Sequence, residues 1–231
     1  MIEDTEITDT EITDTEITDT EITDTDQAVA VAALFGDAGT PPEDATTERI
    51  LDAALAQFVD FGLRRTSVDD VAKRAGVSRV TVYRRFQNRD VLVGATLARE
   101  YQRFLAVLDP VVRVLPTMQE RIVEGFLATL RHVQSHPLLG GLLRSEPETV
   151  LPALTVDGGP ALVAMRDYLT RAFEHFQREA GVEDPDPAPA AEIMVRIVMS
   201  FLLNPTSCVD LADDEAARSF ARRYLAPMVG R

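Results

Sequence analysis

Apolar side chains recur every three or four positions along most of the chain from residue 46 onward, which is the period of an amphipathic helix. The first such stripe runs from Ile50 to Phe61. It predicts a helix that Thr46 or Thr47 caps and that ends at Gly62. No run of alternating apolar and polar residues and no hairpin signal interrupts the pattern. Further helices are expected at 89–108, 117–135, 138–145, 147–154, 160–180, 188–203 and 213–227. The pattern therefore predicts an all-α protein.

Capping signals divide the segment between residues 62 and 90 into short helices. Ser67 is expected to cap a second helix, which ends at Gly76. Ser78 is expected to cap a third helix that runs to about Phe86, and Asn88 a fourth. Two short helices joined by a tight connection are the layout of a helix-turn-helix.

The spacing within this segment fits that motif in detail. Ala72 supplies the small residue at the helix crossing, Gly76 the left-handed turn residue, and Val82 a buried apolar residue. The stretch from 71 to 89 also has six basic side chains and no acidic one, the usual signature of a phosphate-binding surface. A basic, solvated helix in an ordinary bundle would explain the charge but not the spacing. The six are Lys73, Arg74, Arg79, Arg84, Arg85 and Arg89.

Residues 46–100 resemble the DNA-binding domain of the tetracycline-repressor (TetR) family of bacterial regulators. The segment GVSRVTVYRRFQNRDVL, residues 76–92, is similar to the family's recognition helix and the start of its fourth helix almost position by position. The resemblance implies a homodimer that binds a palindromic operator and, in most members, represses transcription until a small molecule releases it. It also implies three parts: an extension and linker over 1–44, a helix-turn-helix domain over 45–90, and a helical ligand-binding and dimerisation domain over 91–231.

The resemblance assigns DNA contacts residue by residue. Arg79 and Val80, at the start of the recognition helix, are similar to base-edge contacts, and Arg79 is placed to form a bidentate pair with guanine. Thr81 and Arg84 share that face and are candidates for base or backbone contacts. Arg84 stands where the family often has an aromatic residue or histidine. The candidates for phosphate and backbone contacts are Tyr83, Arg85, Arg89, Thr47 and Thr66.

The net charge of -15 is concentrated in the first part of the chain. Residues 1–44 have 14 acidic side chains and no Lys or Arg, which leaves 24 acidic and 23 basic residues for all that follows. Within them, residues 5–25 repeat the pentapeptide Thr-Glu-Ile-Thr-Asp, which has too little apolar surface to fold and is expected to be disordered. An apolar patch at 28–35 and a linker follow. The repeat is either a solvated extension or an acidic arm that competes with DNA for the basic face.

The resemblance implies that two of the later helices pair with their symmetry mates in a four-helix dimer interface. The helix expected at 188–203 is apolar nearly all round, and the helix at 160–180 has an apolar stripe. A monomeric core would give the same pattern. The candidate interface residues are Leu162, Leu169, Phe176, Ile193, Ile197 and Phe201.

Soft Met and Phe side chains on these helices are candidates to line an adaptable ligand cavity, although each is also an ordinary core residue. Because few ionisable residues lie on these faces, the expected effector is lipophilic: an acyl chain, a steroid-like molecule or an aromatic compound. Gly140 and Gly141 weaken a short helix that is a candidate to shift on binding. The candidate cavity residues are Phe104, Met118, Phe126, Leu130, Met165, Phe173 and Met194.

Other chemistry has little support in the sequence. His132 and His136 have the spacing of a metal site but lack an evident third ligand, so no metal and no cofactor are expected. Cys208 is the only cysteine, which fits a reducing compartment, and an inert thiol is favoured over a redox sensor. No catalytic motif, signal peptide or membrane-length apolar run is present, so the expectation is a cytoplasmic regulator without enzymatic activity or membrane contact. A regulator that acts through a protein partner without a ligand, and an activator, stay open.

Overall fold

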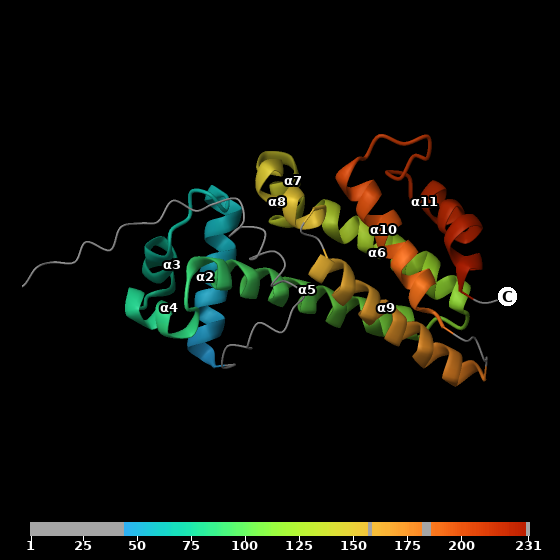
Figure 1. Ribbon diagram of the computed structural model, residues 1–231, viewed down its shortest axis with the longest axis horizontal. Coiled ribbons are helices and arrows are strands. Elements are labelled where there is room, and N and C mark those ends of the chain that lie inside the picture. The colour runs from blue at the N-terminus through green and yellow to red at the C-terminus, as the bar shows by residue number, and fades with distance from the viewer. Residues whose placement is uncertain (1–43, 157–158, 182–185, 230–231) are drawn as a thin grey trace, which may run out of the picture.

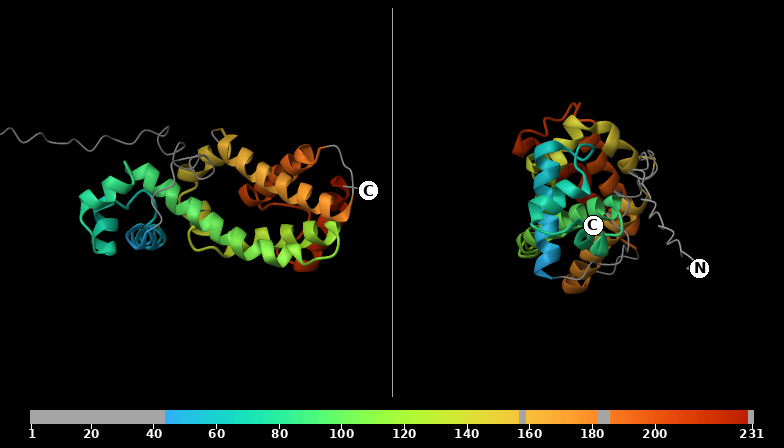
Figure 2. Two further views of the ribbon diagram at one scale, coloured as in Figure 1. Left: turned by 90° about the horizontal axis from the view of Figure 1, so that it is seen from below. Right: turned by 90° about the vertical axis from the view of Figure 1, so that its left-hand side faces the viewer.

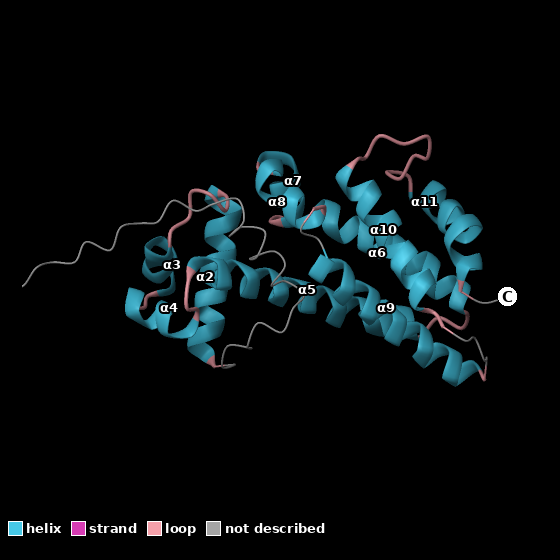
Figure 3. Ribbon diagram, in the orientation of Figure 1, coloured by secondary structure: helices cyan, strands magenta, loops and turns pink. Residues whose placement is uncertain are grey.

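The computed structural model describes residues 44–156, 159–181 and 186–229, and within these ranges the regular elements are all helices (Figure 3). The all-α prediction is confirmed. Predictions for residues 1–43, including the acidic repeat and the apolar patch at 28–35, lie outside the described residues. The helices are α2 (Ala45–Phe61), α3 (Val68–Ala75), α4 (Arg79–Arg85), α5 (Arg89–Arg113), α6 (Met118–Ser135), α7 (Leu139–Ser145), α8 (Pro147–Leu154), α9 (Gly159–Ala180), α10 (Ala188–Leu203) and α11 (Asp214–Phe220).

Helix α2 is capped by Asp44 and not by Thr46 or Thr47, so the predicted cap was wrong. One carboxylate oxygen of Asp44 accepts hydrogen bonds from the backbone N–H groups of Thr46 (2.9 Å) and Thr47 (2.8 Å). A carboxylate interacts more favourably than a hydroxyl with the positive end of the helix dipole. The two threonines consequently lie inside the first turn.

Helices α3 and α4 form the predicted helix-turn-helix. Ser67 and Asp70 make a reciprocal capping box at the start of α3. Gly76 has φ 66°, the left-handed conformation that glycine adopts without a Cβ penalty, and Ser78 caps α4. Val71 and Val82 are fully buried in the core that the two short helices share with α2.

Helix α5 is five residues longer than the predicted 89–108 and includes Pro110. Proline removes the hydrogen bond to the carbonyl four residues earlier, which belongs to Ala106. Because Ala106 and Pro110 are both exposed, water can satisfy that carbonyl and the helix continues. It runs from the helix-turn-helix end of the molecule into the bundle formed by α6, α9, α10 and α11 (Figure 1).

The end of the chain also differs from the prediction of one helix over 213–227. Helix α11 stops at Phe220, and a π-helical turn over Ala221–Leu225 and a short 3₁₀ turn over Ala226–Met228 follow. Pro227 has no N–H to continue the α-helical ladder. Ala217 and Ala221 are fully buried in the core shared with α6, α9 and α10.

The helices enclose two hydrophobic cores. The first lies among α2, α3, α4 and the first turns of α5, as far as Leu97, and it includes Leu138 and Leu142 from the α7 region. The second lies among α6, α9, α10 and α11. Helix α7 therefore packs its apolar side chains into the core of the helix-turn-helix region although it follows α6 in the chain.

Candidate nucleic-acid interface and cavity

Helix α4 lies at one end of the molecule and has an exposed outer face (Figures 1 and 2). The Ser78 hydroxyl accepts a hydrogen bond from the Thr81 N–H at 3.2 Å, which fixes the start of the helix. Val80 is 75% exposed, an unusual position for an apolar side chain unless it meets a partner. Arg79, Tyr83 and Arg84 are exposed on the same helix. Side chains from this helix have the reach and chemistry to contact base edges in a major groove.

Carboxylates lie against the basic side chains, although none occurs between residues 71 and 89. Asp69 pairs with Arg79 at 3.3 Å, and Asp44 pairs with Arg85 at 2.8 Å. The Arg79 guanidinium also lies 5.3 Å from the centre of the Tyr83 ring. The expectation from the sequence that no acid opposes these arginines is therefore wrong in space, because Asp69 lies just before the basic stretch and Asp44 comes from the start of α2. The contacts orient Arg79 before any DNA arrives.

Three predicted contact residues point into the domain. The Arg89 guanidinium donates to the backbone carbonyls of Leu63 and Thr66, and burial lowers its pKa. The Thr66 hydroxyl donates to the Gly62 carbonyl at 2.8 Å. Thr47 is buried, and its hydroxyl has no hydrogen-bond partner among the residues described. These contacts hold the loop between α2 and α3, and DNA contact by the three side chains stays a prediction.

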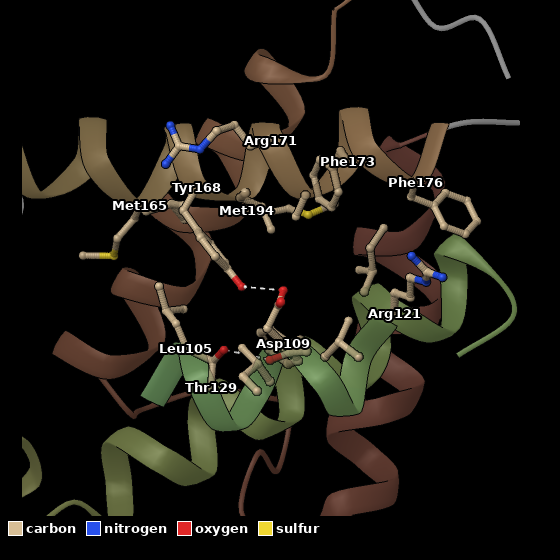
Figure 4. Close-up of a pocket in the computed structure, with 18 of the residues that line it drawn as sticks. Leu105, Asp109, Arg121, Thr129, Met165, Tyr168, Arg171, Phe173, Phe176 and Met194 are labelled. Atoms are coloured by element: carbon tan, nitrogen blue, oxygen red, sulfur yellow. Dashed lines mark hydrogen bonds between the residues drawn. The ribbon is translucent and has the colours of Figure 1, made fainter. Parts of the chain in front are cut away.

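A cavity of about 420 Å³ lies inside the bundle, between α5 and α9, with further walls from α6 and α10 (Figure 4). Six of the seven predicted cavity residues line it, and Leu130 is instead packed in the second core. Leu169 and Phe176, predicted for the dimer interface, line the cavity too. The six are Phe104, Met118, Phe126, Met165, Phe173 and Met194.

The cavity wall has more ionisable side chains than expected, so the prediction of a wall with few such residues was wrong. Asp109 and Arg113 come from α5, and Tyr168 comes from α9. The sequence argument missed the first two because it ended the helix at residue 108, before Pro110. Continuing the helical period by one turn beyond Leu105 would have placed Asp109 on the same face. Tyr101, Arg121, Arg171 and His175 also line the wall.

A buried polar cluster connects the cavity region with the first core. Glu100 on α5 lies 3.4 Å from Nε2 of His136, whose Nδ1 accepts from the N–H groups that start α7. His132 stacks on Phe104, a cavity residue, with ring centroids 4.2 Å apart, and lies 5.1 Å from the ring of His136. The two predicted metal-spaced histidines thus have other contacts.

Ion pairs join the same part of α5 to α2. Arg99 pairs with Glu48 at 3.1 Å and with Asp52 at 2.9 Å. The Glu146 carboxylate, at the start of α8, accepts from the backbone N–H of Arg64 in the α2–α3 loop at 3.3 Å. The helix-turn-helix region is therefore held both by α5 and by the start of α8.

The predicted dimer residues divide between surface and interior. Ile193 on α10 is 47% exposed, and Leu162 on α9 is half-buried. Ile197 and Phe201 pack beside the second core, and Phe201 meets Phe220 edge-on. Helices α9 and α10 pack along each other, so Ile193 lies on a two-helix face with Arg166, Glu192 and Arg196.

A helix-turn-helix joined by one long helix to a helical bundle with an inner cavity defines the class of helix-turn-helix transcription regulators. Residues 50–96 match the family of bacterial regulatory proteins called the tetR family, and residues 118–222 match the bacterial tetracyclin repressor C-terminal domain. The chain belongs to the TetR family of transcriptional regulators. None of the helices in the described part of the chain has the length and hydrophobicity to span a bilayer.

Relatives and solved structures agree with this assignment. The HTH-type transcriptional regulators MT1294 and AlkX of Mycobacterium tuberculosis are each 27% identical over 79% of this chain, covering 84% and 86% of their own lengths. The TetR-family repressor AlkX from Dietzia sp. is similar in structure, with a TM-score of 0.61, 26% identity, and coverage of 79% of this chain and 98% of AlkX. RolR in complex with resorcinol has a TM-score of 0.58 at 18% identity, over 80% of this chain and 87% of its own, and supports the fold alone.

Proposed function

We propose that the chain is a dimeric repressor that binds a palindromic operator through α4 and leaves it when a small molecule fills the cavity. The exposed α4 face, the basic side chains around it and the family assignment support DNA binding. The printed descriptions of two structural relatives name a repressor implicated in n-alkane biodegradation and a complex with resorcinol. Both descriptions fit regulators of small organic molecules.

The observation that carries the gating proposal is the continuity of α5. Its first turns are buried in the core of the helix-turn-helix region, where Leu92 and Leu97 are almost inaccessible to solvent. Its last turns line the cavity with Leu105 and Asp109. A rigid helix that contacts both sites transmits a displacement at one end to the other. Filling the cavity therefore changes the position of α4 relative to its symmetry mate.

Selection of bound duplexes from a random pool, followed by fluorescence anisotropy with the selected DNA, tests the proposal. We expect a palindromic site whose half-sites lie about one helical turn apart or a little more. Affinity should fall steeply with salt, since several phosphates are neutralised. Small organic molecules that bind the protein should weaken operator binding at least tenfold. Equal, weak binding to every duplex would remove operator recognition from the proposal.

The same assay separates the alternatives. A regulator that works through a protein partner would retain its operator affinity in the presence of every compound shown by calorimetry to bind the cavity. An activator would bind the operator but increase transcription from a template that contains it. Transcription in vitro with purified polymerase distinguishes activation from repression directly.

A further inference from the structure

Asp109 and Tyr168 face each other across the cavity from different helices. The Tyr168 hydroxyl points from α9 toward α5 and donates to Oδ1 of Asp109 at 3.4 Å, while Oδ2 of Asp109 lies 2.6 Å from Nε of Arg113 (Figure 4). A distance of 3.4 Å is near the outer limit for a hydrogen bond between oxygens, whose usual separation is about 2.7–2.8 Å. Oδ1 and the phenol are therefore only weakly satisfied by each other.

The cavity wall is mainly apolar, with a few polar side chains among which are Asp109 and Arg113. The side chains of Asp109 and Arg113 are 33% and 57% exposed, so this pair is close to solvent. Phe173 and Met194, which also line the cavity, are buried members of the second core. A molecule with an apolar body and one polar end fits such a wall, because the body replaces water against apolar side chains while the polar end keeps hydrogen bonds.

We propose that Asp109 and Tyr168 form the binding site for an uncharged hydroxyl group of an amphipathic effector. The hydroxyl donates to Oδ1 of Asp109 and accepts from the phenol of Tyr168, replacing one long hydrogen bond with two of ordinary length. The proposal rests on the function proposed above, which makes the cavity the effector site. It narrows the expectation of a lipophilic effector to a long-chain alcohol or an alkylated phenol.

Charge compensation within the Asp109–Arg113 pair favours a neutral ligand group over an ion. Arg113 already neutralises Asp109, so an ammonium group would gain little and would meet the guanidinium. A carboxylate would lie against Asp109, and the other basic side chains of the wall are paired elsewhere or point away from Asp109. Arg121 donates to the carbonyls of Leu115 and Arg113 and pairs with Glu179. His175 also pairs with Glu179, and Arg171 points away from Asp109 (Figure 4).

The phenol is suited to donate at every physiological pH. Burial, with the neighbouring Asp109 carboxylate as the second cause, raises the pKa of Tyr168 to about 12. Tyr101, also in the wall, has a pKa raised by burial. Both phenols are consequently protonated in the range where the protein would work.

Isothermal titration calorimetry with four ligands of similar size tests the proposal. Decyl alcohol and its isomer nonyl methyl ether have the same atoms, but only the alcohol can donate a hydrogen bond; decanoate and decylamine supply the two charges. We expect the alcohol to bind about tenfold more tightly than the ether, as a hydrogen bond to a charged acceptor provides. We also expect it to bind more tightly than either ion.

Two variants and one control test which side chains contact the hydroxyl group of the ligand. Asp109→Leu should reduce the alcohol-to-ether affinity ratio to near one while ether binding is retained. Tyr168→Phe should weaken binding of the alcohol and the ether alike, about threefold or more, because both ligand oxygens can accept from the phenol. Thr129→Val removes another hydroxyl of the cavity wall, which donates to the Gly125 carbonyl at 2.7 Å, and should leave the ratio unchanged. Equal affinity for alcohol and ether in the unmodified protein, tighter binding of either ion, or a ratio that survives Asp109→Leu would overturn the proposal.

Operator release, measured separately, distinguishes the proposed hydroxyl site from the proposed effector gating on which it rests. If decyl alcohol binds in an Asp109-dependent manner but the operator affinity is unchanged, the hydroxyl site stands and effector gating is wrong. If a ligand without a hydroxyl releases the operator and the alcohol does not bind, gating stands and the hydroxyl site is wrong.

Discussion

Arg79 is the side chain whose chemistry most directly specifies a base. It begins α4, and Asp69 and Tyr83 hold its guanidinium before DNA binds. Replacing Arg79 with Ala should cost about 1–3 kcal/mol of operator binding and relax the preference at one base pair. Lys73→Ala, on the exposed side of α3, should weaken operator and scrambled duplexes alike. Anisotropy with both duplexes measures the difference, and an unchanged operator preference in Arg79→Ala would show that another residue specifies the base.

Substitutions at Arg89 and at Arg84 should separate an effect on stability from an effect on DNA binding. The Arg89 guanidinium donates to the carbonyls of Leu63 and Thr66, whereas Arg84 is exposed. Arg89→Gln should lower the free energy of unfolding by about 2–3 kcal/mol, because hydrogen bonds to a partly buried charge are lost. Arg84→Gln should leave unfolding unchanged and cost about 1–3 kcal/mol of operator binding. Urea denaturation and anisotropy on both variants check the contrast. If Arg89→Gln weakened operator binding without loss of stability, Arg89 would be a DNA contact.

His132 is expected to make the protein less stable in acid. Burial, and after it the neighbouring His136, lowers its pKa, while Glu100 acts in the opposite direction. Its Nε2 is buried and has no hydrogen-bond partner among the described residues. The unfolded chain therefore takes up the proton first, and stability is lost as the pH falls below about 6.5.

His132→Phe retains the stacking on Phe104 and removes the buried nitrogen. It should stabilise the protein by about 1 kcal/mol at pH 7 and reduce the loss of stability between pH 7 and pH 5. Thermal denaturation across that range is the measurement. An identical pH dependence in both proteins would mean that His132 does not titrate differently on unfolding.

At the scale of the elements, α7 is the connection between the two cores that can be tested most sharply. A Cβ at Gly140 would lie 2.8 Å from the carbonyl oxygen of Gln134 and 2.9 Å from that of Val133, both on α6. Gly140→Ala should therefore displace α7 and cost about 1–3 kcal/mol of stability. A Cβ at Gly141 would meet no atom of the described residues within 4 Å, so Gly141→Ala should be neutral or stabilising by up to about 1 kcal/mol. Denaturation of the pair, with operator binding as a second readout, checks the role of α7; equal effects would contradict it.

The sequence predicted elements well where the signal was local and failed where it depended on the environment. Ser67, Gly76 and Ser78 act on their own neighbours along the chain, and their predicted roles are confirmed. Pro110 is different, because whether proline ends a helix depends on whether the freed carbonyl reaches water. That misjudgement left Asp109 and Arg113 outside the predicted helix and therefore outside the predicted cavity wall.

At the scale of the whole molecule, periodicity does not distinguish a cavity from a core or an interface. Leu130 and Phe126 both follow the apolar period of α6, yet only Phe126 lines the cavity. Leu169 and Phe176 were assigned to an interface from the same kind of pattern, and both line the cavity. The difference is a small rotation of each helix about its axis, which packing against distant helices determines and no local pattern records.

Ile193 should report whether the outer face of α9 and α10 joins two copies of the chain. It is 47% exposed on α10, next to the Arg166–Glu192 pair, and a charge at the centre of an interface is strongly unfavourable. Ile193→Glu should give a monomer with unchanged helical content and at least tenfold weaker operator binding, because one half-site alone contributes. Val107→Glu places the same charge at a 70% exposed site on α5 and should remain dimeric. Sedimentation velocity measures the oligomeric state, circular dichroism the helical content and anisotropy the operator affinity. If the Ile193→Glu variant were dimeric with intact operator affinity, the interface would lie on another face.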